Sequence, residues 1–254
     1  HDNVQGATDV GPNPDSLPGY YGLAEGSWKH WCGVWGVDYE RVKGRYASQE
    51  LMEKSGITVS RWIDGVLENK ELIDQPAGNL RAVVYWGHAP NSQTRGAEMV
   101  AAMKALDTLV VIDPYPSATA AMAAMVRKEG VYLLPACTQF ETHGSATASN
   151  RSLQWREKVI EPLFESKPDH TIMYAFAKKF GWGEQFVKNI KLEKDAQGWD
   201  EPSMEDTLRE INRGTWTIGY TGQSPERLKL HMKNMHTFDV KTLKAVGGPC
   251  DGEY

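Results

Sequence analysis

One stretch of the sequence, LPACTQFETHGSATASNR at residues 134–151, is dense in side chains that can bind a ligand. An apolar segment ends at Leu134-Pro135, and small or hydrogen-bonding residues follow it. The hydrogen-bonding residues are Thr138, Gln139, Glu141, Thr142, His143, Ser145, Thr147, Ser149, Asn150 and Arg151. A plain surface connection rarely needs so many donors and acceptors, so we interpret this stretch as a loop that holds a polar ligand.

Two alternatives for this loop need no such ligand. His143 together with Glu141 and Cys137 would suggest a metal site, but their spacing matches no standard metal motif. In the second alternative, Glu141 and Arg151 simply form an ion pair with a structural role.

Two further polar stretches also follow apolar runs: HAPNSQTRG comes after Gly87, and PYPSAT comes after Asp113. Asp113 stands 113 − 87 = 26 residues after Gly87. An acidic residue at about this place in dinucleotide-binding folds accepts hydrogen bonds from a ribose or a base edge. Thr94 and Ser117 stand where helix N-caps are expected, and free backbone N–H groups at helix N-termini favour anions.

Each of these residues also has a structural explanation. Asp113 with the following proline is compatible with a simple turn, Ser117 with an ordinary helix cap, and Asn91 with a turn shaped by its own side chain. GHAPNSQTRG also lacks the G-x-G-x-x-G pattern of nicotinamide dinucleotide sites. A nicotinamide-binding dehydrogenase domain is therefore an alternative hypothesis rather than the favoured one.

The elements that would position these loops alternate between strands and helices. The apolar, strand-forming runs are RAVVYWG (81–87), TLVVID (108–113) and VYLL (131–134). The helix-forming runs between them are AEMVAAMKAL (97–106) and AAMAAMVRKEG (120–130). This alternation predicts an α/β fold with a parallel sheet and right-handed crossovers. Because the strands are continuously apolar, we expect helices on both faces of the sheet.

In a parallel sheet, every loop that leads from a strand to a helix lies at the carboxyl edge, where ligands bind. The sequence therefore predicts that the loops 87–96, 113–119 and 135–150 converge in space. This convergence is the main physical inference from the pattern.

The rest of the chain divides into a leading and a trailing part. We expect residues 1–80 to be an irregular and helical segment that leads in from a preceding domain. Its part at 1–36 would be irregular but packed, because disordered segments rarely hold so many aromatic residues, and helices would follow at 38–54 and 58–69. Residues 81–185 would form the dinucleotide-binding core, including a helix at 170–180. Residues 186–254 would form a helical extension toward a missing C-terminal domain. Its predicted elements are a loop or insertion at 186–202, a helix at 203–212 with Ser203 as N-cap, and a helix at 224–235 with Ser224 as N-cap and Pro225 at the first helical position.

Composition excludes several classes of protein. The chain has 254 residues and a formal net charge of −5, which argues against a nucleic-acid partner. The longest apolar runs are strand-sized, so no membrane span is expected. Three widely spaced cysteines without a CxxC motif indicate neither a zinc site nor an iron–sulfur cluster in this chain. The chain begins at HDNVQG without an initiator methionine, which predicts a piece of a longer protein.

Taken together, several stretches resemble the catalytic subunit of molybdenum- or tungsten-dependent formate dehydrogenases, within the molybdopterin oxidoreductase (DMSO reductase-type) group. The stretches are NVQGATDVG (3–11) with LPGY (17–20), strand-loop-helix 81–106 with VVIDPYPSATA (110–120), LPACTQFETHGSATASNRSLQW (134–155) and PDHTIMYAFAKKFG (168–181). The resemblance covers nearly the whole chain. It implies two molybdopterin guanine dinucleotides on one Mo or W, oxidation of formate to CO2, and electron transfer through iron–sulfur clusters.

The resemblance also implies roles for particular residues. Twelve residues of this chain match family positions that bind the cofactor or lie near it. They are His1, Gly87, His88, Asn91, Asp113, Ser117, Thr138, Gln139, Glu141, Gly144, Asn150 and Arg151. Asp113 and Ser117 fall at the guanosine end, and His1 falls beside a position near the pterin. Another molybdopterin oxidoreductase is the alternative within this group.

The family's catalytic residues are not found in this chain. Its iron–sulfur cysteine motif, its cysteine or selenocysteine metal ligand with the adjacent histidine, and its formate-orienting arginine have no match here. The resemblance therefore implies that this chain has no catalytic or metal-binding residues of its own and works as part of a full subunit. The resemblance further implies an iron–sulfur partner subunit and a periplasmic location.

Overall fold

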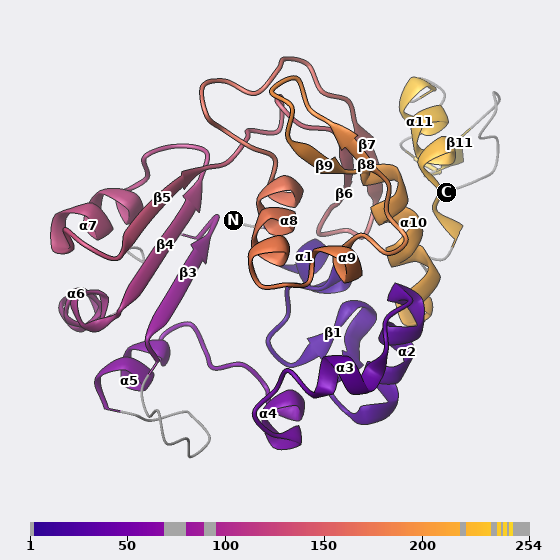
Figure 1. Ribbon diagram of the computed structural model, residues 1–254. Coiled ribbons are helices and arrows are strands. Elements are labelled where there is room, and N and C mark those ends of the chain that lie inside the picture. The colour runs from indigo at the N-terminus through magenta and orange to yellow at the C-terminus, as the bar shows by residue number, and fades with distance from the viewer. Residues whose placement is uncertain are drawn as a thin grey trace.

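The computed structural model describes residues 3–68, 80–88, 95–218 and 222–234, with the short segments 238–239, 241–242 and 244–245. Its central feature is a parallel sheet of three strands in the order β3-β4-β5 (Figure 1). The strands are β3 (Ala82–Trp86), β4 (Thr108–Asp113) and β5 (Val131–Pro135). Val110 of the central strand stands between Val84 and Tyr132. The predicted α/β class and parallel sheet are confirmed.

Helices lie on both faces of this sheet, as the continuous apolar strands predict. The helices of the first face are α5 (Trp62–Leu67), α6 (Gly96–Ala105) and α7 (Ala118–Val126). Their core includes Met99 and Met103 against Leu109 and Val111. On the second face, α8 (Asp169–Lys179) contributes Ile172 to a smaller cluster that includes Val110 and Ile112.

Helix caps follow the sequence chemistry. The Ser117 hydroxyl accepts a hydrogen bond from the backbone N–H of Ala120 and begins α7. Ser203 and Ser224 cap α10 (Met204–Gly214) and α11 (Pro225–Lys233) in the same way, and Pro225 stands in the first turn. These predicted caps are confirmed.

The N-terminal segment is more regular than the sequence indicates. Its helices are α1 (Val4–Val10), α2 (Glu25–Trp35), α3 (Tyr39–Lys43) and α4 (Gln49–Glu53). A hairpin of β1 (Ser16–Leu17) and β2 (Tyr21–Gly22) lies between the first two, around a 3-10 turn at Pro18–Tyr20. The prediction that 1–36 is irregular is wrong, because Trp28, Trp31 and Trp35 repeat at helical spacing and Trp31 and Trp28 are buried in the core beneath α2. The helix predicted over 38–54 is divided in two, because α3 ends before Gly44 and Ser48 caps the start of α4. The helix predicted over 58–69 begins only at Trp62.

The C-terminal part consists of helices and small antiparallel hairpins. The hairpin strands are β6 (Gly144–Thr147) with β7 (Leu153–Arg156), β8 (Leu192–Lys194) with β9 (Asp200–Pro202), and β10 (Phe238–Asp239) with β11 (Lys244–Ala245). The short helix α9 (Gly183–Phe186) and the 3-10 turn Trp216–Ile218 complete it. The predicted loop at 186–202 is wrong, because the Asp195 carboxylate accepts hydrogen bonds from the N–H groups of Gln197 and Trp199 and closes a tight hairpin.

The ribbon places the sheet with α5, α6 and α7 on one side and the N- and C-terminal elements on the other, with α8 between them (Figure 1). The tips of the strand arrows point toward this second group. Within the described residues, no helix has the length and apolar character needed to cross a bilayer. The division into 1–80, 81–185 and 186–254 stays a prediction.

Candidate functional site

The three predicted loops leave the sheet at one edge. The Gly87 N–H donates to the Ile112 carbonyl at 2.9 Å, and the Ala136 N–H donates to the Asp113 carbonyl at 3.1 Å. The Thr119 hydroxyl, on α7, donates to the His88 carbonyl at 3.2 Å and ties the first loop to the second. The starts of the loops therefore lie side by side. Asn91 and His1 lie outside the described residues, so their predicted roles stay predictions.

Asp113 stands at the mouth of a cavity at this edge. The cavity has a volume of about 200 Å³ and is lined by Val111, Asp113, Pro114, Tyr115, Pro116, Ala120, Leu133, Leu134 and Pro135. The Asp113 carboxylate accepts a long hydrogen bond of 3.3 Å from the Tyr115 N–H. A carboxylate has about four acceptor positions, so Asp113 both shapes its turn and keeps capacity for a donor on a ligand.

The backbone at the end of β3 is exposed at the same edge of the sheet. Gly87 has a φ of +56°, and a Cβ built there would meet no heavy atom of the described residues within 4 Å. The positive φ accounts for glycine at the end of β3, because other L-residues rarely adopt this conformation. The edge thus combines an acceptor, an apolar wall and exposed backbone.

Glu141 anchors the beginning of the third loop. Its carboxylate is buried and accepts hydrogen bonds from the Thr138 N–H at 2.7 Å, the Thr138 hydroxyl at 2.8 Å and the Leu163 N–H at 2.6 Å. Ser166 adds a weaker hydroxyl contact at 3.4 Å. Burial opposes ionisation, but these hydrogen bonds outweigh it and lower the pKa of Glu141. The alternative of an ion pair with Arg151 is wrong, because the Glu141 carboxylate is already surrounded by loop donors.

Arg151 instead joins the far end of the loop to the N-terminal helix. Its Nε lies 3.2 Å from a carboxylate oxygen of Asp9, whose side chain is fully buried. Arg151 has a φ of +63°. Asn3, which caps α1, donates a short hydrogen bond to the Thr147 carbonyl. Helix α1 is therefore fastened to the loop at both of its ends.

The other predicted site residues of this loop lie in different settings. Asn150 accepts hydrogen bonds from the Ser152 N–H and hydroxyl and forms a local turn. Gln139 is exposed, whereas Gly144 is buried. His143 faces Glu205 of α10 at 3.7 Å, and in the described part of the chain no three His, Cys, Asp or Glu side chains are grouped to hold a metal ion.

Sequence reasoning overlooked Asp9 as a site residue. Asp9 lies in the stretch NVQGATDVG and is the single acidic residue of a short helix that is otherwise uncharged. This isolated charge is the sequence feature that could have pointed to Asp9. A buried carboxylate needs a partner, and Arg151 is that partner. The loop thus divides into a part held by Glu141 and a part held through Asp9.

Gly144 supplies a test of the loop geometry. Its φ is +136°, and an added Cβ would lie 3.3 Å from Cγ of Met204. We expect Gly144→Val to lower the free energy of unfolding by about 1–3 kcal/mol, because valine is strained at this angle and crowds α10. Urea unfolding would measure the change. Ser145→Val, at the adjacent exposed strand position, is the matched control; equal stability of the two variants would contradict the expectation.

Comparison with known proteins identifies relatives for most of the chain. The profile of the family described as molybdopterin oxidoreductase matches residues 6–179. The chain is 33% identical over 186 residues to "Probable oxidoreductase YjgC" of Bacillus subtilis (strain 168), covering 72% of this chain and 16% of that protein. It is 29% identical over 229 residues to the F420-dependent formate dehydrogenase subunit alpha of Methanocaldococcus jannaschii, covering 90% of this chain and 27% of that subunit.

A solved structure also resembles the chain. Acetylene hydratase from Pelobacter acetylenicus aligns with a TM-score of 0.46 and 15% identity, over 89% of this chain and 25% of that one. The chain thus spans 16% and 27% of the length of the two curated relatives above.

Proposed function

Because the chain belongs to the molybdopterin oxidoreductase family, we propose that it forms part of the catalytic subunit of a formate dehydrogenase. A relative of this chain is named as a formate dehydrogenase alpha subunit, which supports the proposal. Since the chain spans 27% of that relative, the catalytic activity belongs to the whole subunit.

We propose that the carboxyl edge of the sheet holds the guanosine end of a molybdopterin guanine dinucleotide. The observation that carries this proposal is the Asp113 carboxylate, which keeps free acceptor positions beside an apolar cavity of about 200 Å³. A guanine base offers N–H donors on one edge and a flat apolar face, so it fits this combination. Gly87 and His88 would approach the nucleotide from the first loop, and Ser117 from the second.

The third loop would close over the cofactor. In this proposal Thr138, Gln139 and Gly144 line the closure, while Glu141 fixes its backbone and Asn150 and Arg151 position its far end. His1 and Asn91 complete the proposed set. The residues of this chain bind and orient the cofactor, and none of them takes part in the reaction itself.

When bound, such a cofactor supplies a Mo or W centre that accepts two electrons as formate loses a proton and becomes CO2. The remainder of the subunit would provide the metal ligand. We further propose that the electrons leave through iron–sulfur clusters to an iron–sulfur partner subunit, and that the complex is periplasmic.

Asp113→Ala tests the proposed guanosine site. We expect cofactor retention in the full-length protein to weaken by about 1–3 kcal/mol, or roughly 5- to 150-fold in dissociation constant, because a charge-assisted hydrogen bond is lost. Metal content and released guanosine nucleotide per purified protein measure this loss. Glu129→Ala removes an exposed acidic residue near the opposite edge of the same sheet and is the matched control. Unchanged cofactor content in Asp113→Ala would refute the site.

A further inference from the structure

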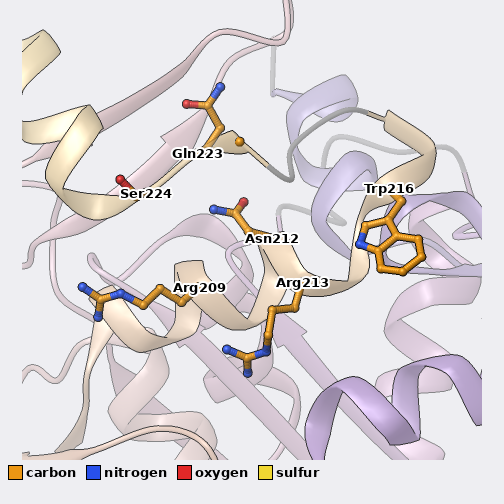
Figure 2. A pocket seen from close by; sticks show the side chains of 7 residues that line it. Arg209, Asn212, Arg213, Trp216, Gln223 and Ser224 are labelled. Carbon is orange, nitrogen blue, oxygen red and sulfur yellow. The ribbon is translucent and has the colours of Figure 1, made fainter.

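A second cavity lies away from the sheet, between α10 and the start of α11. Its volume is about 560 Å³, which suits a small ligand. Its lining residues are Arg209, Asn212, Arg213, Trp216, Gly222, Gln223 and Ser224 (Figure 2). None of these residues belongs to the proposed dinucleotide site.

Four of the lining residues lie close together in the sequence. Arg209, Asn212 and Arg213 stand on α10, and Trp216 begins the 3-10 turn that follows it. Figure 2 shows the Asn212 amide projecting from α10 toward the segment that carries Gln223 and Ser224. The cavity therefore has a helical wall and an opposite wall made by the beginning of α11.

The charge of the lining is positive, because the described residues that form it include two arginines and no acidic side chain. Arg209 is neutralised by hydrogen-bonded ion pairs with Asp206 at 2.9 Å and with Glu226. Among the described residues, the carboxylate that faces Arg213 is that of Glu210 at 3.7 Å, and 47% of the Arg213 side chain is exposed. Arg213 thus retains donors for an anion.

Asn212 brings an unpaired acceptor to the same wall. Its relative exposure is 7%, and within the described part of the chain its Oδ1 atom accepts no hydrogen bond. An unsatisfied buried acceptor costs roughly 1–3 kcal/mol, so a ligand donor that reached Oδ1 would recover this energy. A ligand with an N–H donor would therefore suit this wall of the cavity better than one without.

Trp216 supplies a flat surface beside these groups. Its relative exposure is 67% although it is a large aromatic residue. The centroids of the His30 and Trp216 rings are 5.8 Å apart. His30 Nε2 also lies 3.0 Å from the Gly214 carbonyl oxygen, and this contact fixes the turn that carries the indole. An exposed, positioned indole offers a stacking face for a planar ring.

We infer that this cavity binds an adenine nucleotide. An asparagine amide matches the N6 amino donor and N7 acceptor of adenine, Trp216 matches its ring, and Arg213 matches a phosphate. A cation, a planar face and an amide thus line one cavity, which suits a ligand that is anionic, planar and N–H-bearing. This inference does not depend on the proposed dinucleotide site.

Equilibrium dialysis of the full-length protein with labelled adenosine monophosphate tests the inference. We expect saturable binding of one exchangeable nucleotide per protein. Inosine monophosphate, which lacks the N6 amino donor, should bind about tenfold more weakly. Arg213→Gln should weaken adenosine monophosphate about tenfold and leave adenosine unchanged, because only the phosphate contacts the guanidinium.

Two further variants locate the binding. Asn212→Leu should erase the preference for the adenine nucleotide over the inosine nucleotide. Circular dichroism checks that this variant folds. If it does not fold, Arg213→Gln provides the test, because Arg213 is exposed. Asp113→Ala should leave this binding unchanged. The inference is overturned if wild-type protein binds no adenosine monophosphate at millimolar concentration, if both nucleotides bind equally, or if Asp113→Ala rather than Arg213→Gln weakens binding.

Discussion

Replacing Glu141 with alanine is expected to lower the free energy of unfolding by about 3–5 kcal/mol. The carboxylate accepts hydrogen bonds from the N–H groups of Thr138 and Leu163 and from the Thr138 hydroxyl. Each charge-assisted bond contributes roughly 1.5–3 kcal/mol, and buried donors left without an acceptor carry a further cost. Chemical denaturation at neutral pH measures the loss, and proteolysis within the third loop should accelerate with it.

The same carboxylate predicts a pH dependence. The pKa of Glu141 in the folded protein is below its ordinary value of 4.5. The stability it contributes is therefore complete above pH 4.5 and is lost as the pH falls through the lowered folded value. The difference in stability between wild type and Glu141→Ala should shrink over this acidic range.

Glu161→Ala is the control for Glu141→Ala. Glu161 lies in the connection between β7 and α8, which also carries Leu163. Its side chain is 61% exposed, and among the described residues it forms an ion pair with Lys158 three residues away. Surface pairs of this kind contribute little, so we expect a change within about 0.5 kcal/mol. A Glu141→Ala protein as stable as Glu161→Ala would contradict the anchoring role of Glu141.

Replacing Gly6 with alanine is expected to cost about 3 kcal/mol and to loosen α1 from the third loop. A Cβ at Gly6 would lie 2.5 Å from the Thr147 carbonyl oxygen, a backbone atom that cannot rotate away. Overpacking of this kind forces elements apart. Hydrogen exchange of the backbone N–H groups of α1, together with urea unfolding, measures the effect.

Gly33→Ala in α2 is the same kind of substitution as Gly6→Ala, but its expected effect on stability is the opposite. A Cβ there would meet no heavy atom within 4 Å in the part of the chain that the structure describes. Alanine is favoured over glycine inside a helix by about 1 kcal/mol, so this variant should be slightly more stable than wild type. If Gly6→Ala were stabilising as well, the close approach of α1 to Thr147 would be disproved.

The sheet and its caps are predictable from the sequence because their signals are local. Apolar runs such as LVVI and the serines before α7, α10 and α11 carry enough information within a few neighbours. Helix α2 was overlooked because Gly26 and Gly33 weaken its helical pattern. The β8–β9 hairpin was overlooked because its residues are polar and its turn depends on Asp195.

The candidate site is only partly predictable. The common edge of the three loops follows from topology, and Asp113 follows from its position at the end of β4. The distant partners of Glu141 cannot be predicted in this way, because Leu163 and Ser166 lie 22 and 25 residues away and carry no local signal. The pairing of Asp9 with Arg151 likewise depends on tertiary contacts.

The fastening of α1 has a consequence for synthesis on the ribosome. Asp9 and Arg151 are separated by 142 positions, and α1 has 7 residues, too few for a stable isolated helix. At translation rates of about 5–20 residues per second, roughly 7–28 s pass between the emergence of Asp9 and that of Arg151. During this interval the Tyr20 hydroxyl is available to Gln5 and Thr8 of α1, but Arg151 is not. The attachment of α1 to the third loop is therefore completed only after Arg151 has left the exit tunnel.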